Sequence, residues 1–225
     1  MMMKKIFRGN SYALVIPIAA LLFSTLSFGL AKLLCFWRPH WNLTLPWDAS
    51  VPFLPWTVTV YLGSFLYWYL CFVLIATKER ELADRFFCAH MLTVILSFLC
   101  YVLMPTTLDR PEITGGGLWN LLMRIVYWVD TPENLFPSLH CSTGWLCWVG
   151  VRRRKDLPFW LKLLFLLLSL LVCISTLTTR QHVMADVVSG VALAELDFLL
   201  ASIPQLRRLY SRIADAFLRR LPAIE

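Results

Sequence analysis

Long apolar runs separated by short polar connections dominate the hydropathy pattern of the chain. A helix needs about 20 mostly apolar residues in succession to cross a bilayer. Five runs approach that length, and a sixth, shorter run could cross with little tilt. The runs cover residues 12–31, 56–76, 86–104, 138–151, 158–178 and 182–203. The pattern therefore predicts an all-α bundle of six membrane-spanning helices that forms one domain over residues 1–225.

Composition supports a membrane protein and argues against two other classes. Of the 225 residues, 59% are hydrophobic and 16% are charged. A soluble domain has about 45–50% apolar and about 25% charged residues, and a disordered chain is more polar still. The net charge is +7, and the basic residues border the apolar runs. That placement fits topology and anionic lipid, so we expect the bilayer as a partner and no nucleic acid.

The basic residues also predict an orientation. Six spans place both termini on one side, and fifteen Lys and Arg residues fall on that side, against five on the other. By the positive-inside rule both termini are then cytoplasmic. The short, lysine-poor outer connections favour a bacterial plasma membrane. Residues 205–225 form a basic amphipathic tail, which either lies on the anionic leaflet or is a solvated helix end.

Three polar clusters interrupt the apolar pattern, and the predicted topology places all of them at the outer face. They cover residues 109–112, 136–140 and 175–186. Polar side chains are costly inside a membrane and are therefore functional candidates. His182 and Asp186 are four residues apart and share one face of a helix. The carboxylate can accept a hydrogen bond from one imidazole nitrogen, which makes the other a better nucleophile or base.

Two other features could hold an anion beside this pair. Ser138 can cap the start of a helix whose free backbone N–H groups bind anions, and His140 lies in its first turn. Arg110 can clamp phosphate through its planar guanidinium, and Arg180 has the same chemistry. Each feature alone also fits a structural role, such as a cap or a contact with lipid head groups. Together they indicate phosphoryl transfer through a phosphohistidine.

Three stretches resemble the motifs of the phosphatidic acid phosphatase type 2 (PAP2) superfamily. The sequence FPSLH at residues 136–140 resembles a Pro-Ser-x-His motif. Residues 175–190 resemble a motif in which His follows Ser after six residues and Asp follows His after three. Arg110 and the proline after it resemble an Arg-Pro element. The order and spacing cover residues 105–190, and the six-span layout agrees with the same family.

The resemblance implies a role for each motif residue. His182 would be the nucleophile that attacks phosphorus, and Asp186 would orient it. His140 would be the acid that protonates the leaving oxygen. Phosphate would be held by Arg110, Ser138 and the backbone amide of Leu139. The resemblance implies a lipid phosphate as substrate, and neither a metal nor another cofactor.

The chain departs from the PAP2 pattern at three positions. Leu103, Leu139 and Thr176 stand where the family usually has Lys, Gly and Arg. Two phosphate-binding cations are thus missing, and Arg180 is a candidate replacement for one. The resulting motifs resemble the inositol phosphorylceramide synthase branch, which passes a phosphoryl head group to another alcohol. The sequence therefore predicts an outer-leaflet lipid phosphatase, with a head-group phosphotransferase as the alternative.

A non-catalytic lipid transporter or scaffold is a further alternative. Glu195 and Asp197, in the last apolar run, are the residues that would support transport, but no broken helix pair marks a midplane site. We favour a structural role, in which Asp197 pairs with a base such as Arg152 or Lys155. The chain has no CxxC pair, no HExxH and no GxSxG. Zinc and serine-hydrolase chemistry therefore have no motif to support them.

Overall fold

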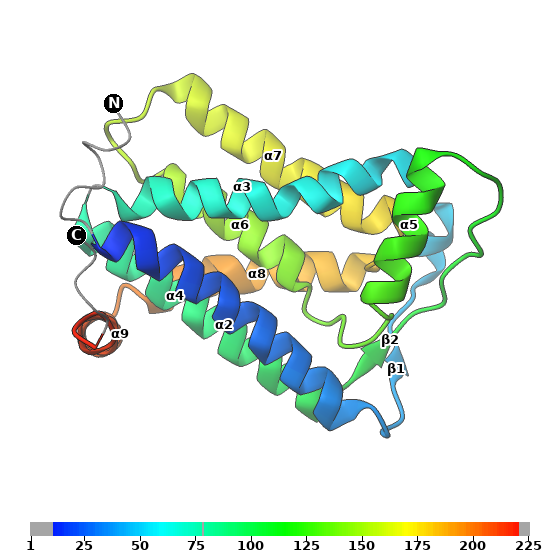
Figure 1. Cartoon of the computed structure of the whole chain (residues 1–225), viewed down its shortest axis with the longest axis horizontal. Coiled ribbons are helices and arrows are strands. Elements are labelled where there is room, and N and C mark those ends of the chain that lie inside the picture. The colour runs from blue at the N-terminus through cyan, green and yellow to red at the C-terminus, as the bar shows by residue number, and fades with distance from the viewer. Residues whose placement is uncertain (1–10, 78, 221–225) are drawn as a thin grey trace.

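A computed structural model describes residues 11–77 and 79–220 (Figure 1). Its helices are α2 (Ser11–Cys35), α3 (Val58–Ala76), α4 (Arg80–Leu103), α5 (Leu118–Val129), α6 (Leu139–Val151), α7 (Phe159–Thr178), α8 (Met184–Leu200) and α9 (Pro204–Leu218). Two short 3-10 helices, η1 (Pro46–Ser50) and η2 (Pro55–Thr57), precede α3. The strands β1 (Trp41–Asn42) and β2 (Thr106–Thr107) pair in parallel. The all-α prediction is confirmed.

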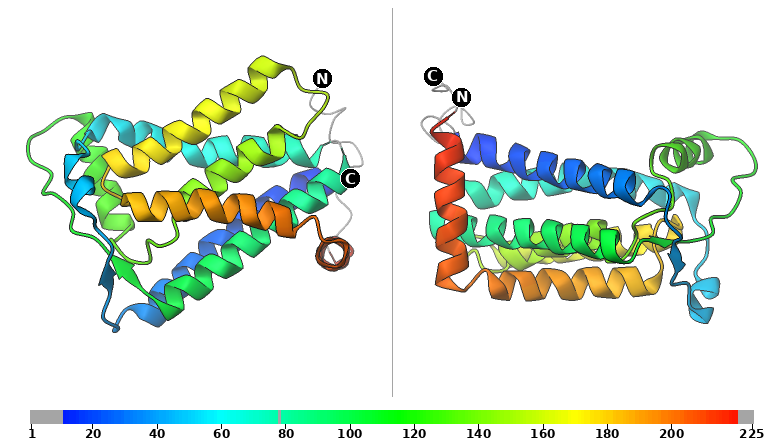
Figure 2. Two further views of the ribbon diagram at one scale, coloured as in Figure 1. Left: turned by 180° about the vertical axis from the view of Figure 1, so that it is seen from behind. Right: turned by 90° about the horizontal axis from the view of Figure 1, so that it is seen from below.

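Most of the helices run lengthwise through the bundle, and successive ones alternate in direction (Figures 1 and 2). They are α2, α3, α4, α6, α7 and α8. One end of the bundle carries α5, β1 and β2, and we call it the site end. At the other end, which we call the distal end, α9 lies across the bundle. Helix α6 lies centrally and contacts α3, α4, α7 and α8.

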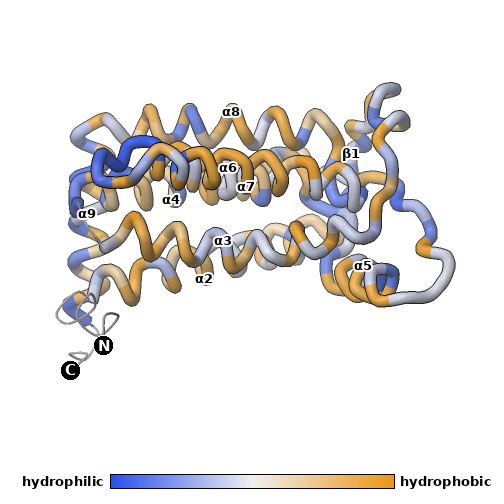
Figure 3. The backbone as a smooth tube through the Cα atoms, turned by 90° about the horizontal axis from the view of Figure 1, so that it is seen from above, coloured by the Kyte–Doolittle hydropathy of each residue, from blue (hydrophilic) through white to orange (hydrophobic). Residues whose placement is uncertain are grey.

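The six-span count is not confirmed, although each predicted run is helical. Four helices are long and apolar enough to span a membrane: α2, α3 with its preceding η2, α4 and α7. The pair α8–α9 would be a fifth span, but it is bent by 91°. Helices α6 and α8 have 13 and 17 residues, fewer than the roughly 20 that a bilayer requires. The hydrophobic residues along the helices are nevertheless consistent with an integral membrane protein (Figure 3).

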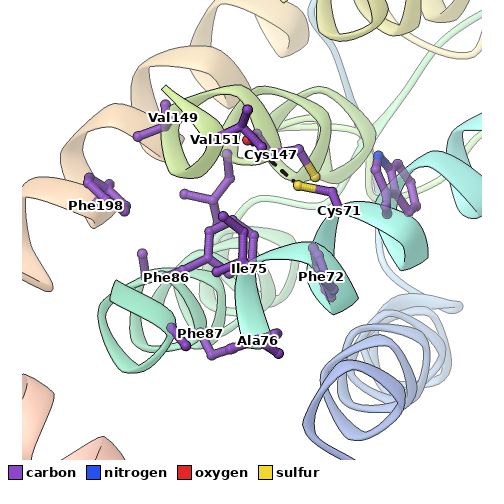
Figure 4. Packing of buried hydrophobic residues seen from close by; sticks show 14 of the residues in the cluster. Cys71, Phe72, Ile75, Ala76, Phe86, Phe87, Cys147, Val149, Val151 and Phe198 are labelled. Carbon is purple, nitrogen blue, oxygen red and sulfur yellow. Dashed lines mark hydrogen bonds between the residues drawn. The ribbon is translucent and has the colours of Figure 1, made fainter. Parts of the chain in front are cut away.

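Small residues bring the central helices close together, as is common in membrane bundles. A Cβ added to Gly190 of α8 would lie 2.5 Å from the backbone oxygen of Ser138, at the start of α6. A Cβ added to Gly150 would lie 2.6 Å from the ring of Phe86 in α4. That ring belongs to the main apolar cluster, in which Phe72 and Phe87 pack edge-on against it (Figure 4).

Ion pairs join the helices at the distal end. Arg80 binds Asp84 and Asp215, each at 2.7 Å, and so links α4 to α9. The buried Arg154 donates to both carboxylate oxygens of Asp156 at 2.7 Å and to a backbone oxygen of α3. Within the described chain, these charged groups find their partners in one another.

One predicted pairing at this end is wrong. The base Arg152 pairs with Glu195 at 2.6 Å, not with Asp197. Asp197 is buried and accepts a hydrogen bond from Thr93 of α4 at 2.7 Å. Residues two apart on a helix point to nearly opposite sides, so Glu195 faces α6 while Asp197 faces α4. The predicted tail forms α9 up to Leu218, and residues 221–225 lie outside the described residues.

Candidate active site

A cavity of about 540 Å³ occupies the site end. Helices α2, α3 and α5 supply most of its apolar wall. The apolar lining residues are Leu21, Phe28, Leu62, Phe65, Trp68, Ile125, Val126, Val129, Leu135 and Leu139. The polar and charged ones are Ser24, Thr25, Lys32, Tyr61, Tyr101, Asp130, Asn134, His140, Thr143, Gln181 and His182. The cavity thus combines a long apolar wall with a set of groups able to bind an anion.

The predicted pair of His182 and Asp186 forms at the start of α8. His182 precedes the helix, and Asp186 lies in its first turn, so the carboxylate reaches back toward the ring. Nδ1 of the imidazole lies 3.4 Å from Oδ2 of Asp186, and the Val183 N–H donates to the same oxygen at 3.0 Å. A proton on Nδ1 is thereby favoured, and Nε2 is left for chemistry.

The surroundings of His182 act on its pKa in opposite directions. Burial lowers the pKa of His182, but the hydrogen bond that its ring donates to Asp186 and the negative charge of that carboxylate raise it, and the net shift is upward. The net pKa therefore lies above the ordinary value of 6.5. A raised pKa makes the neutral ring a stronger base and a stronger nucleophile.

His140 lies in the first turn of α6 and shares the cavity with His182. The two ring centroids are 6.2 Å apart. The His140 ring stacks on Tyr61, with centroids 4.3 Å apart and planes at 19°, and it also contacts Trp68 and Phe65. These aromatic contacts orient the ring, while its Nε2 has no hydrogen-bond partner in the described protein.

Ser138 caps α6, as the sequence predicts. Its hydroxyl accepts a hydrogen bond from the Cys141 N–H at 3.2 Å. Its own N–H donates to the backbone oxygen of Asp186 at 3.0 Å, which joins the starts of α6 and α8. Ser138 is fully buried and does not line the cavity, whereas Leu139 does.

Arg110 lies one layer behind the cavity wall. Its guanidinium donates to the side-chain oxygen of Gln181 and to the backbone oxygen of Asp130. It also packs over the ring of Tyr127, 4.5 Å from the ring centroid. Because Gln181 precedes His182 and lines the cavity, Arg110 is one side chain away from the predicted nucleophile.

Arg180 is directed elsewhere. Its backbone is in the left-handed region, with φ of 54°, and its guanidinium donates to the backbone oxygens of Asp48 and Val51. The Asp48 carboxylate in turn accepts the Met184 N–H at 2.8 Å. Arg180 therefore fixes the η1 segment against the start of α8, and its side chain does not line the cavity.

Of the polar residues in the lining, sequence reasoning named only His140 and His182 as site residues. Those that it did not name include Lys32, Asp130, Asn134 and Gln181. Lys32 Nζ lies 3.8 Å from Asp130 Oδ1. The side chain of Asn134 is buried, and neither of its polar atoms has a partner in the described protein. Asn134 and Gln181 stand beside motif residues, which could have drawn attention to them. Lys32 gives no such signal, because only the fold brings α2 to the site.

Unpartnered polar atoms concentrate around this cavity. In the described part of the chain, eleven buried side-chain nitrogen or oxygen atoms have no hydrogen-bond partner. Six of the eleven belong to Arg110, Asn134, His140, Gln181 and Asp186. Buried polar groups are normally paired, and exceptions point to a missing partner such as a ligand or water. The concentration makes this end the candidate binding site.

A comparison with known families agrees with this location. Residues 119–200 match the PAP2 superfamily. The matched segment runs from α5 to the end of α8 and includes His140, His182 and Asp186, whereas Arg110 and Lys32 lie before it. Neither a curated protein nor a solved structure matches the chain. The match supports a phosphatase-type function, and the inositol phosphorylceramide synthase branch is not confirmed.

The two positions that lack the expected PAP2 cations lie away from the cavity. Leu103, at the end of α4, is 76% exposed. Thr176 is buried in α7, donates to the Cys173 backbone oxygen at 2.8 Å and lies 3.4 Å from the Cys141 sulfur. Neither residue lines the cavity. The described residues contain no group of three or more His, Cys, Asp or Glu that could hold a metal.

Proposed function

We propose that this protein is a membrane-embedded phosphatase that hydrolyses a phosphate monoester or diphosphate of a lipid. One observation carries the proposal: His182, oriented by Asp186, meets His140 in a cavity whose remaining walls are largely apolar. Such walls suit acyl or prenyl chains, and the histidines suit phosphoryl transfer. The distribution of basic residues supports an outer position for the site end, which in a bacterium would be the outer leaflet of the plasma membrane.

The reaction proceeds in two steps. Nε2 of His182 attacks phosphorus, and the bond between phosphorus and the lipid oxygen breaks. His140 enters this step as an imidazolium. It gives the proton on its Nε2 to that oxygen as it leaves, and so becomes neutral. In the second step His140 takes a proton from water, whose oxygen attacks the phosphohistidine and releases phosphate. Asp186 keeps Nδ1 of His182 protonated and stabilises the positive ring in both transition states.

Backbone and arginine groups would hold the phosphate oxygens. The free N–H groups at the start of α6, including that of Leu139, point from a helix N-terminus, which favours anions. Ser138 contributes by capping and fixing that helix start. Arg110 would reach the phosphate once Gln181 moves aside. Arg180 would have to leave the carbonyls of the η1 segment to do the same.

The test is an assay of the purified protein in detergent with EDTA. Phosphatidic acid, a prenyl diphosphate and phosphatidylinositol would be supplied, each with and without diacylglycerol or ceramide. Inorganic phosphate and new lipid products would be measured together. We expect free phosphate from the wild type and an acid-labile phosphoenzyme. His182→Ala should lower turnover by a factor on the order of 10⁴ or more.

The control is His40→Ala, because His40 lies in a connection outside the cavity. It should leave turnover unchanged. Full activity in His182→Ala would refute the mechanism. A new phospholipid in place of free phosphate would identify a head-group phosphotransferase, which shares the first step. Neither product from any donor would favour a non-catalytic lipid transporter or scaffold.

A further inference from the structure

We propose that Lys32 of α2 is a phosphate-binding residue of this site, and that Asp130 holds it in place until a phosphate anion takes over as its partner. This inference rests on the proposed function and deepens it. It adds a cation from a helix that lies outside the segment matched to the PAP2 superfamily. The ligand chemistry is a phosphate oxyanion, either free or at the head of a lipid.

The argument begins with the charge of the cavity. Lys32 is the one Lys or Arg among its described lining residues, and Asp130 is the one carboxylate. A phosphate group in a largely apolar cavity needs an opposite charge, because transferring an unpaired ion out of water is costly. Arg110 lies behind Gln181, so a ligand in the cavity would contact the positive charge of Lys32 first.

The contact between Lys32 and Asp130 is weak enough for Lys32 to exchange Asp130 for a phosphate anion. Their charged atoms are 3.8 Å apart, and the side chains are 20% and 28% exposed, so this pair is looser than a direct hydrogen bond. Asp130 has a second partner, because the Tyr61 hydroxyl donates to its other oxygen at 3.1 Å. The carboxylate can therefore stay in place when the flexible lysine turns to another anion.

The position of Lys32 on α2 also fits a lipid phosphate. The α2 residues that line the cavity are Leu21, Ser24, Thr25, Phe28, Gly29 and Lys32. Their spacing of three and four residues forms one stripe along the helix. The stripe ends with Lys32 in the last turn, where the helix dipole favours a cation. A lipid chain along the stripe would bring its head group to the lysine.

The unpaired amide of Asn134 is independent evidence for a ligand in the same cavity. Its side chain is 1% exposed, and neither the amide nitrogen nor the amide oxygen has a partner in the described protein. Because a buried amide is normally bonded, these two unpartnered atoms point to a polar ligand in the cavity. A phosphate oxygen would accept from the amide nitrogen and from the ammonium group of Lys32.

The test measures binding rather than turnover, so it stands apart from the catalytic proposal. All variants are made on the His182→Ala background, purified in detergent and titrated by calorimetry. One arm uses inorganic phosphate, and the other uses phosphatidic acid in mixed micelles. We expect Lys32→Met to weaken both by about tenfold or more, the effect of losing one charge-assisted hydrogen bond. Lys32→Arg should keep most of the affinity.

Asp130→Asn separates a binding role from a structural one. If Asp130 competes with phosphate for Lys32, Asp130→Asn should tighten phosphate binding several-fold, and Lys32→Met should cancel that gain. The control, Lys162→Met, removes a lysine of α7 that does not line the cavity and should leave both affinities unchanged. Equal affinity in Lys32→Met and its parent, with both proteins folded, would overturn the inference.

Tighter binding of phosphatidic acid than of inorganic phosphate would identify the lipid head group as the ligand source. Equal affinities would identify free phosphate, as a product or inhibitor. Either result supports a phosphate-binding role for Lys32 if Lys32→Met weakens the binding of that ligand. If phosphate binds through Lys32 but no donor is turned over, the catalytic proposal fails while the binding site stands.

Discussion

The two ends of the bundle differ in the partners of their arginine and lysine side chains. At the distal end, Arg80, Arg152 and Arg154 each bind at least one carboxylate within 2.7 Å. At the site end, the arginine and lysine nearest the cavity, Arg110 and Lys32, bind backbone and amide oxygens or a carboxylate 3.8 Å away. Most unpartnered buried atoms of the described chain also lie there.

This difference separates architecture from function. An ion pair closed within the protein holds helices together and offers nothing to a ligand. A buried polar atom without a partner costs stability, so a cluster of them persists only where a ligand or water completes it. Variants at the distal end should therefore lower the temperature of unfolding and leave turnover unchanged. Variants at the site end should lower turnover. The predictions below test that division, beginning with the largest effect.

Asp186→Asn should have the largest effect, because it keeps the shape of the side chain and removes the charge that orients His182. We expect turnover to fall by a factor on the order of 10⁴. In the proposed mechanism the neutral ring of His182 is the nucleophile, so wild-type activity should fall at acid pH, as the ring becomes protonated at its raised pKa. Without the carboxylate, the fall of kcat/KM on the acid side of the pH profile (the acid limb) should move to lower pH. The measurement is kcat/KM against pH, and an unmoved acid limb would contradict the role of Asp186.

Gly190→Ala should have an intermediate effect on turnover. Its new Cβ would lie 2.5 Å from the Ser138 backbone oxygen, so the start of α6 must shift relative to α8. A displacement of about 1 Å in a catalytic arrangement can cost about 100-fold in rate. Gly63→Ala is the matched control, because its Cβ meets nothing within 4 Å. Equal turnover in the two variants would show that the close approach of α6 and α8 is not needed for catalysis.

Arg154→Met should leave chemistry unchanged and lower stability. The guanidinium is 2% exposed and bonds both Asp156 oxygens and a backbone oxygen of α3. Hydrogen bonds to charged groups contribute about 1.5–3 kcal/mol, so the midpoint of thermal unfolding in detergent should fall by several degrees. The neighbouring Arg153 is exposed, and Arg153→Met is the control. A loss of phosphate affinity in Arg154→Met would contradict the idea that residues at the distal end affect only stability.

The helices could be predicted from the sequence because apolar run length is a local property. The first predicted run, residues 12–31, lies within α2 (Ser11–Cys35). The span count is not local, since the run over residues 182–203 forms a helix of only 17 residues, which is followed by a 91° bend. The pairing of Glu195 rather than Asp197 with Arg152 likewise depends on which way α8 is turned.

The candidate site shows the same limit. The pair of His182 and Asp186 and the cap at Ser138 follow from local spacing, and both form. Lys32 could not be predicted as a site residue, because 150 residues separate it from His182 and only tertiary packing brings them to one cavity. Arg180 is the opposite case. It lies two residues before His182 in the sequence, but its guanidinium points away from the cavity, to the backbone oxygens of Asp48 and Val51.

The length of α8 bears on the depth at which the proposed reaction would take place. Its 17 residues span about 25 Å at 1.5 Å per residue, whereas a hydrocarbon core is about 30 Å thick. If α9, at right angles to α8, rests on one membrane surface, His182 lies below the phosphate plane of the opposite leaflet. A lipid would have to sink, or the bilayer would have to thin, to meet it. Hosts with shorter acyl chains should therefore present substrate more readily.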